Sequence, residues 1–122
     1  MKLNNLELCL IKKFIARNPS FDFDKSLEVI DVTERLIEGK GFFTTLNILN
    51  APHMKDEKLS FQWGEIGAKV NNETELDFLF FIENGILKMI EGYTLSGDDF
   101  PKDISKVDIY DIKLTEYKKT TK

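Results

Sequence analysis

Leu76–Leu95, LDFLFFIENGILKMIEGYTL, is the stretch that decides the fold. Two apolar runs flank Asn84-Gly85, the dipeptide that most favours a two-residue type I′ turn, because Asn and Gly tolerate the positive φ that both central positions need. The stretch therefore predicts an antiparallel hairpin at the centre of a sheet. Phe78 to Ile82 carries apolar side chains on both faces, so we expect this strand to be covered by the curling sheet on one side and by a helix on the other.

The expected helix lies at the N-terminus. Asn4 can cap it, and Glu7 can reach back to the cap as in a capping box. Apolar residues recur at helical spacing from Leu3 to Phe14. Asn18-Pro19 should end the helix, because the residue before a proline is pushed out of the helical region.

Alternating apolar residues predict further strands elsewhere in the chain. These strands cover residues 26–37, 42–49, 61–70 and 107–114. Gly64 and Gly67 suggest a bulge or a close backbone approach, and Asn50 to Ser60 is the clearest exposed loop. The sum is a single α+β domain over residues 1–122, with an N-terminal helix packed on a curved, mainly antiparallel sheet of five to six strands.

The composition indicates a cytoplasmic globular protein. Of the 122 residues, 42% are hydrophobic and 31% are charged, which is ordinary for a chain long enough to bury a core. No run approaches the roughly 18 apolar residues of a membrane span, and the first residues do not form a signal peptide. The single cysteine, Cys9, excludes an internal disulfide.

Charge is distributed unevenly along the chain. Residues 65–111 carry eleven acidic and four basic side chains, a net charge of −7, whereas residues 112–122 carry a net charge of +3. An acidic surface repels the phosphates of nucleic acids and attracts basic proteins. We therefore expect no nucleic-acid binding, and the acidic half fits either a basic partner or a merely solubilising surface.

Few residues could support catalysis. Cys9 lies among apolar residues of the helix, where we expect an inert packed thiol. His53 is a lone loop histidine, so a zinc site of Cys and His is excluded. Carboxylates near the hairpin could act as general acid and base or hold a hard cation; they are Glu83, Glu91, Asp98, Asp99 and Asp103. Because Asp98-Asp99 lacks calcium-loop spacing, we predict no catalytic residue, no metal site and no cofactor.

Two segments resemble a pattern found in small bacterial proteins. Gly64–Ile104, GEIGAKVNNETELDFLFFIENGILKMIEGYTLSGDDFPKDI, is similar to a pattern in which an FLLFIEDG strand is followed by LEGYTYGEEWP and a final strand. Gly39–Thr45, GKGFFTT, fits its earlier GxGFFT part, whereas Phe100 stands where the pattern has Trp. Proteins of this kind resemble the immunity proteins of bacterial toxin systems, including contact-dependent growth inhibition.

The resemblance implies a non-catalytic immunity protein that binds a cognate toxin domain and blocks its active site. A nuclease toxin exposes basic residues, so an acidic inhibitor can mimic nucleic acid and associate fast. The expected contact residues lie in the acidic turns that flank the hairpin: Glu73, Glu75, Asp98, Asp99 and Asp103. The alternative is a protein-interaction or small-ligand-binding domain of another process. We expect a monomer or a weak homodimer paired through an exposed edge strand.

Overall fold

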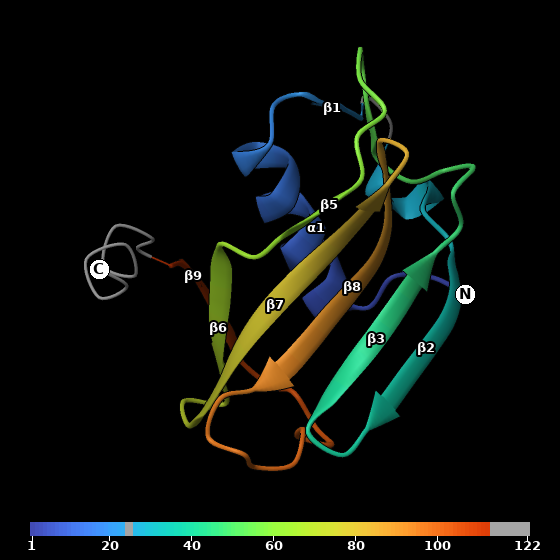
Figure 1. The fold of residues 1–122 in the computed structure, drawn as a ribbon. Coiled ribbons are helices and arrows are strands. Elements are labelled where there is room, and N and C mark those ends of the chain that lie inside the picture. Colours follow the sequence, from blue (N-terminus) through green and yellow to red (C-terminus); the bar gives the residue numbers. More distant parts are fainter. Residues whose placement is uncertain (24–25, 113–122) are drawn as a thin grey trace, which may run out of the picture.

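The predicted hairpin forms the centre of an antiparallel sheet. The computed structural model describes residues 1–23 and 26–112 (Figure 1). Strands β7 (Thr74–Glu83) and β8 (Ile86–Thr94) are paired along their length. Between them, Asn84 has φ 52° and Gly85 has φ 77°, as a type I′ turn requires. The prediction of the hairpin is therefore confirmed.

Shorter strands extend the sheet from both edges of the hairpin (Figure 1). Along the β8 edge lie β3 (Gly41–Leu46) and β4 (His53–Met54), which pair in turn with β2 (Val32–Glu38) and β1 (Phe21–Asp22). Along the β7 edge lie β5 (Phe61–Trp63) and β6 (Ile66–Val70), and β6 pairs with β9 (Val107–Asp111). All of these pairs are antiparallel.

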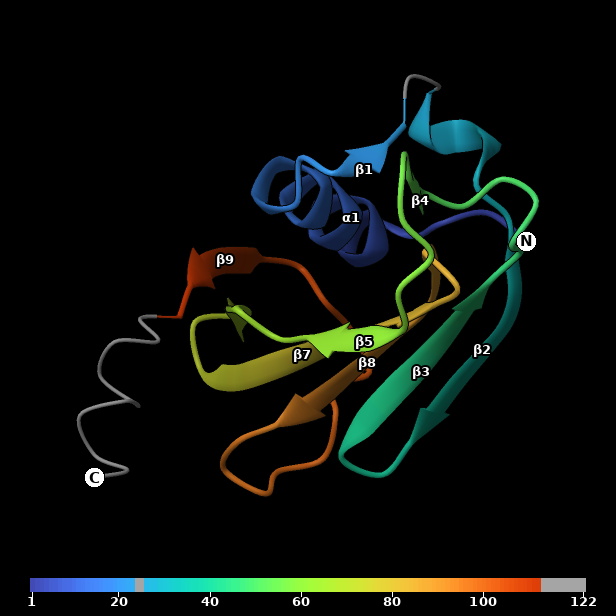
Figure 2. The ribbon, with the colours of Figure 1, turned by 45° about the horizontal axis from the view of Figure 1, so that its top comes forward.

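Helix α1 (Asn5–Arg17) covers one face of this sheet (Figure 2), which confirms the α+β class. Its start is the predicted capping box: Glu7 N–H donates to Asn4 Oδ1 and Asn4 N–H donates to Glu7 Oε1, each over 2.8 Å. The helix ends at Arg17 with Asn18 as its C-terminal cap, immediately before Pro19 as predicted. Local capping signals therefore set both ends of the helix.

The predicted strand over residues 26–37 begins later than expected. Leu27–Val29 forms a short 3₁₀ helix, and the strand β2 starts only at Val32. The reason is Ser26, whose hydroxyl oxygen accepts a hydrogen bond from Glu28 N–H over 3.3 Å and so caps a helical turn. The last predicted strand, residues 107–114, is seen as β9, and its residues 113–114 lie outside the described residues.

The predicted strand over residues 61–70 is divided into β5 and β6, both of which pair with β7. The division falls at Gly64, where a Cβ atom would lie 2.8 Å from Leu79 Cδ2 and 3.1 Å from the backbone oxygen of Phe78. The expected close backbone approach at Gly64 is therefore confirmed. The predicted exposed loop, Asn50 to Ser60, is mostly exposed but contains the short strand β4.

The core lies between α1 and the face of the sheet that this helix covers. Alternate side chains of β7 point into it: Thr74, Leu76, Phe78, Phe80 and Ile82. Phe14 of α1 stacks on Phe80 with ring centroids 5.0 Å apart, and its ring meets Trp63 at 5.4 Å in an edge-to-face contact. Trp63 is therefore a core residue.

The opposite face of the sheet, which we call the outer face, is not covered as predicted. Leu79 and Phe81 of β7 point away from α1 and are only half-buried. Among the described residues, no second layer lies over them (Figure 2). The expectation that the curling sheet covers this face is wrong, because these side chains are sheltered instead by their neighbours on β8, Phe81 beside Met89 and Leu79 beside Glu91.

Candidate protein-binding surface

The acidic turns meet at one end of the sheet. The turn at residues 71–73, between β6 and β7, lies beside the loop at residues 95–106, between β8 and β9 (Figure 1). Glu73, Asp98 and Asp99 line one hollow of about 340 Å³ there, together with Thr74 and Pro101. We call the five predicted contact residues in this region the acidic end: Glu73, Glu75, Asp98, Asp99 and Asp103.

The five residues of the acidic end are all exposed, but the structure does not bring all of them to one point. Glu73, Asp98 and Asp99 share the hollow. Glu75 points to the outer face from β7, and Asp103 lies further along the loop toward β9. The acidic end is therefore a hollow with three carboxylates, with Glu75 beside it on the outer face and Asp103 further along the loop.

Asn71 fastens the loop to the turn. Its Oδ1 accepts hydrogen bonds from the N–H and the hydroxyl of Ser105, both over 2.9 Å, and from Lys106 N–H over 3.2 Å. Its Nδ2 donates to the backbone oxygen of Asp103 over 2.8 Å. Asn71 was not among the residues expected at the site. The sequence feature that could have indicated its role is the Asn71-Asn72 pair, because Asn is favoured at turn positions of positive φ. Both residues adopt positive φ, 54° and 61°.

The same loop is bound on its other side to the turn between β2 and β3. Thr94 N–H donates to the backbone oxygen of Lys40 and Phe100 N–H to that of Gly39, each over 2.9 Å. Phe100 is buried and meets the ring of Phe42 edge to face, with centroids 5.3 Å apart. The backbone that carries the acidic end is therefore held from two sides, which reduces the ordering that binding would require.

Asp98 is additionally held within its own loop. The Thr94 hydroxyl donates to the backbone oxygen of Asp98 over 2.6 Å, and the Ser96 hydroxyl donates to Asp98 Oδ2 over 2.7 Å. The carboxylate thus has a preferred position at the surface while remaining accessible to a partner.

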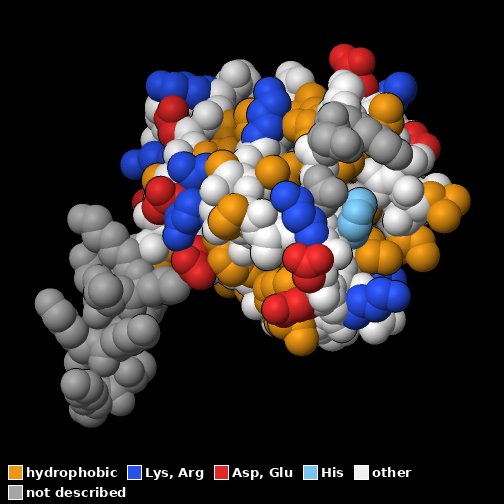
Figure 3. Space-filling model, turned by 90° about the horizontal axis from the view of Figure 1, so that it is seen from above, with side chains coloured by type: hydrophobic (Ala, Val, Ile, Leu, Met, Phe, Trp, Pro, Cys, Tyr) orange, Lys and Arg blue, Asp and Glu red, His pale blue; other side chains and the backbone are white. Residues whose placement is uncertain are grey.

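At the opposite end of the molecule, basic and acidic side chains are interspersed around the exposed His53 (Figure 3).

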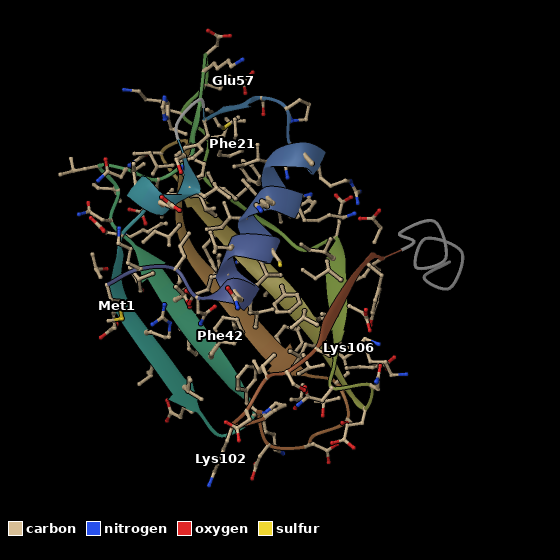
Figure 4. The ribbon with its side chains drawn as sticks, turned by 180° about the vertical axis from the view of Figure 1, so that it is seen from behind. Met1, Phe21, Phe42, Glu57, Lys102 and Lys106 are labelled. Atoms are coloured by element: carbon tan, nitrogen blue, oxygen red, sulfur yellow. The ribbon has the colours of Figure 1, made fainter. Side chains whose placement is uncertain are left out.

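A larger hollow, of about 500 Å³, lies at the start of α1 (Figure 4). It is bounded by α1, by β2 and β3, and by the loop that follows Phe100; its apolar lining includes Leu6, Ile37, Phe42, Phe100, Ile104 and Val107. Cys9 opens onto it and is exposed. The expected packed thiol is therefore wrong, because the helical turn places Cys9 on the flank of α1 rather than on the buried stripe that holds Leu6 and Leu10.

A buried ion pair forms one wall of this hollow. The Glu7 carboxylate accepts hydrogen bonds from Arg35 Nε and Nη2, over 2.8 and 2.6 Å, and from the Thr44 hydroxyl over 2.6 Å. Burial would raise the pKa of Glu7. The hydrogen bonds from Arg35, Thr44 and Asn4 N–H, with the charge of Arg35, outweigh burial and hold this pKa below its usual value. Glu7 therefore stays ionised and joins α1 to β2 and β3.

The carboxylates considered for catalysis do not converge. Glu83 lies at the end of β7 and pairs with Lys88 over 2.9 Å, whereas Asp98 lies at the acidic end and Glu91 on the outer face. Among the described residues, no group of three or more His, Cys, Asp or Glu side chains could hold a metal ion. In the same residues, no helix has the length and apolar character needed to cross a bilayer.

The fold and this surface define an α+β protein with one helix on an antiparallel sheet and a fixed acidic end. Comparisons of the chain with protein-family models, with curated proteins and with solved structures give no match.

Proposed function

We propose that this protein is a non-catalytic immunity protein, which binds a basic surface of a cognate bacterial toxin domain and thereby neutralises it. The observation that supports this function best is the acidic end, where Glu73, Asp98 and Asp99 surround one hollow. The backbone that carries them is fastened by Asn71 on one side and by the turn between β2 and β3 on the other.

Such an arrangement suits the inhibition of a nuclease. A nuclease holds phosphates with Lys and Arg, and fixed carboxylates can occupy the same positions in competition with the substrate. Opposite charges also steer the two proteins together, with association rate constants that reach about 10⁸–10⁹ M⁻¹s⁻¹ at low salt. The inhibitor needs no reactive group of its own for this task.

The experiment first examines the genes beside the one for this protein, because an immunity gene lies directly beside its toxin gene. The C-terminal domain of the neighbouring toxin is expressed with and without this protein, growth is followed, and binding is measured by calorimetry. We expect restored growth and a dissociation constant of about 1 nM or below, as in tight inhibitory complexes. A locus without a toxin gene, or a toxin domain that neither binds nor is neutralised, would refute the function.

The contact residues are tested by charge reversal. Asp98→Lys with Asp99→Lys should weaken binding at least about tenfold and slow association. The matched control is Asp56→Lys with Glu57→Lys, an adjacent exposed pair outside the acidic end, which should change affinity by less than about twofold. Equal effects of both pairs would show that only net charge matters and would remove the acidic end from the contact surface.

A second candidate function is the binding of a small ligand, which is favoured by the hollow at the start of α1. Its volume of about 500 Å³ lies within the range of about 300–1,000 Å³ found for small-molecule sites. The probe is the apolar anion 1-anilinonaphthalene-8-sulfonate. Fluorescence enhancement that is lost in Ile37→Asp and retained in Leu36→Asp would support this function, because Ile37 lines the hollow and Leu36 points to the outer face. Equal enhancement in both variants would contradict it.

A further inference from the structure

The outer face carries apolar side chains on four adjacent strands, β2, β3, β8 and β7. The strand register places Leu36 of β2 beside Phe43 of β3, and Met89 of β8 beside Phe81 of β7. Side chains directly opposite one another in an antiparallel pair lie in contact. We call this set the outer patch: Leu36, Phe43, Leu79, Phe81 and Met89. Leu36 is 48% exposed, and the other four are half-buried.

Acidic side chains surround and interrupt the outer patch. Glu91 lies between Phe43 and Leu79 in the register, and Asp77 lies between Tyr93 and Gly67. On the strands of this face the outward carboxylates are Glu34, Glu38, Glu75, Asp77, Glu83, Glu91 and Asp108. Two lysines stand among them: Lys69 lies between Glu75 and Asp108, and Lys88 pairs with Glu83 over 2.9 Å. The face is therefore strongly acidic with an apolar centre.

An apolar centre inside a polar rim is the usual anatomy of a protein interface. The sign of the charge on this rim decides which kind of partner can bind. A second copy of this chain would place seven carboxylates against the same seven, and nucleic acid would bring further negative charge. A protein surface with Lys and Arg around an apolar or aromatic anchor fits both parts of the face.

The environment of Asp77 supports the same partner. Burial and the neighbouring charge of Glu75 raise the pKa of Asp77, so its charged form is disfavoured in the free protein. A cation from a partner would relieve this repulsion. Glu75 belongs both to this face and to the acidic end, and its backbone oxygen accepts a hydrogen bond from Leu95 N–H over 2.9 Å. The two surfaces are therefore contiguous.

We propose that the outer face is the main docking surface for a basic protein partner, with the outer patch as its apolar centre and the acidic end as one border. The identity of the partner rests on the proposed function. The position of the surface does not, so the two can be tested separately.

The first experiment uses a probe that is independent of any toxin. A synthetic eight-residue peptide of alternating Lys and Leu is titrated into the full chain, and backbone amide shifts are followed by NMR; a Glu and Leu peptide is the control. We expect shifts on β2, β3, β7 and β8 with the basic peptide alone. Equal binding of the acidic peptide, or shifts confined to other strands, would overturn the proposal.

Two neighbouring residues give a matched pair of variants. Leu36 and Ile37 are adjacent on β2, both are exposed, and they point to opposite faces of the sheet. Leu36→Lys should weaken peptide binding at least about fivefold, and Ile37→Lys less than about twofold. Glu91→Lys at the centre of the face should weaken binding further. Fluorescence of Trp63 and thermal melting verify that each variant is folded. Equal effects of Leu36→Lys and Ile37→Lys would contradict the docking surface.

The toxin domain from the neighbouring gene then separates this proposal from the proposed function. If Asp98→Lys with Asp99→Lys weakens toxin binding while Leu36→Lys and Glu91→Lys leave it unchanged, the docking surface is refuted and the function stands. If the basic peptide binds the outer face but no toxin domain binds the protein, the function is refuted and the docking surface stands.

Two other occupants of the face are tested in the same way. Sedimentation at about 100 μM should show a monomer; a dimer that is lost in Leu36→Lys and kept in Ile37→Lys would assign the face to a second copy. Replacing Lys113, Lys118, Lys119 and Lys122 by Gln should leave peptide affinity within about twofold. A gain above about tenfold would show that the basic end of the chain competes for the face. Either result would overturn the proposal.

Discussion

Substitution of Glu7 by Gln should destabilise the fold by about 3 kcal/mol. The Glu7 side chain is 1% exposed and accepts four hydrogen bonds, from Asn4 N–H, from two nitrogens of Arg35 and from the Thr44 hydroxyl. Removing one partner of a buried ion pair costs about 3–5 kcal/mol. The lower end applies here, because the Arg35 side chain is 21% exposed and water can partly replace the lost carboxylate.

Urea unfolding measures this cost. With a slope of about 1.5 kcal/mol per molar urea, a loss of about 3 kcal/mol lowers the midpoint by about 2 M. Glu34→Gln is the control, because Glu34 precedes Arg35 on the same strand but is exposed on the outer face. It should change stability by less than about 0.5 kcal/mol. A loss below about 1 kcal/mol in Glu7→Gln would refute the reasoning.

The pH dependence gives a second, independent check. The pKa of Glu7 is lower in the folded protein than its usual value of 4.5, so the ionised carboxylate stabilises the fold fully above that value. This contribution is lost as the pH falls through the lower pKa of the folded state. The stability difference between the natural protein and Glu7→Gln should therefore be constant near neutral pH and shrink below about pH 4.5. A difference that does not change with pH would contradict the assignment.

Three further substitutions test the turns and the outer face. Gly85→Ala should destabilise the protein by about 1–2 kcal/mol more than Gly39→Ala, as measured by thermal melting. Both glycines have positive φ, but a Cβ at Gly85 would lie 2.6 Å from a backbone oxygen of the loop before β5. A Cβ at Gly39 would meet nothing within 4 Å. Equal losses would contradict this contact. Asn71→Ala should cost about 1–2 kcal/mol more in urea unfolding than Asn72→Ala, because both have positive φ and the Asn71 side chain makes the bonds to the loop; a smaller loss at Asn71 would argue against its fastening role. Asp77→Asn should raise the melting temperature at pH 7 by about 2 °C, because burial and the nearby Glu75 raise the pKa of Asp77. This gain should vanish below about pH 3.8, where the Asp77 carboxyl is neutral in both the folded and the unfolded protein.

The hairpin and the helix could be predicted from sequence because their signals act between near neighbours. Asn84-Gly85 sets its own turn, and Asn4 with Glu7 closes its own capping box. The second role of Glu7 could not be predicted in this way. Arg35 lies 28 residues from Glu7 in the chain, and the contact exists only because β2 and β3 bring Arg35 and Thr44 beneath the start of α1.

The surface was predictable in part. Glu73 and Asp98 were candidates because their turns flank the hairpin, and the paired ends of β7 and β8 do bring these turns to one hollow. The outer face was missed, because apolar residues on both sides of a strand indicate coverage and do not say what provides it. Leu79 and Phe81 therefore predicted a second layer where the described chain has only their cross-strand neighbours.

The order of strands along β8 has a consequence for the speed of folding. The hairpins β2–β3 and β7–β8 are closed by turns of two residues, so each can form alone in about 1–10 μs. Pairing β3 with β8 joins the two hairpins and places Thr45 beside Met89. This pairing must close the long segment of chain that lies between β3 and β7. The loss of chain entropy precedes the gain from this contact. We therefore expect the docking of two preformed hairpins to limit the folding rate, and mutations at the β3–β8 seam to slow folding more than they accelerate unfolding.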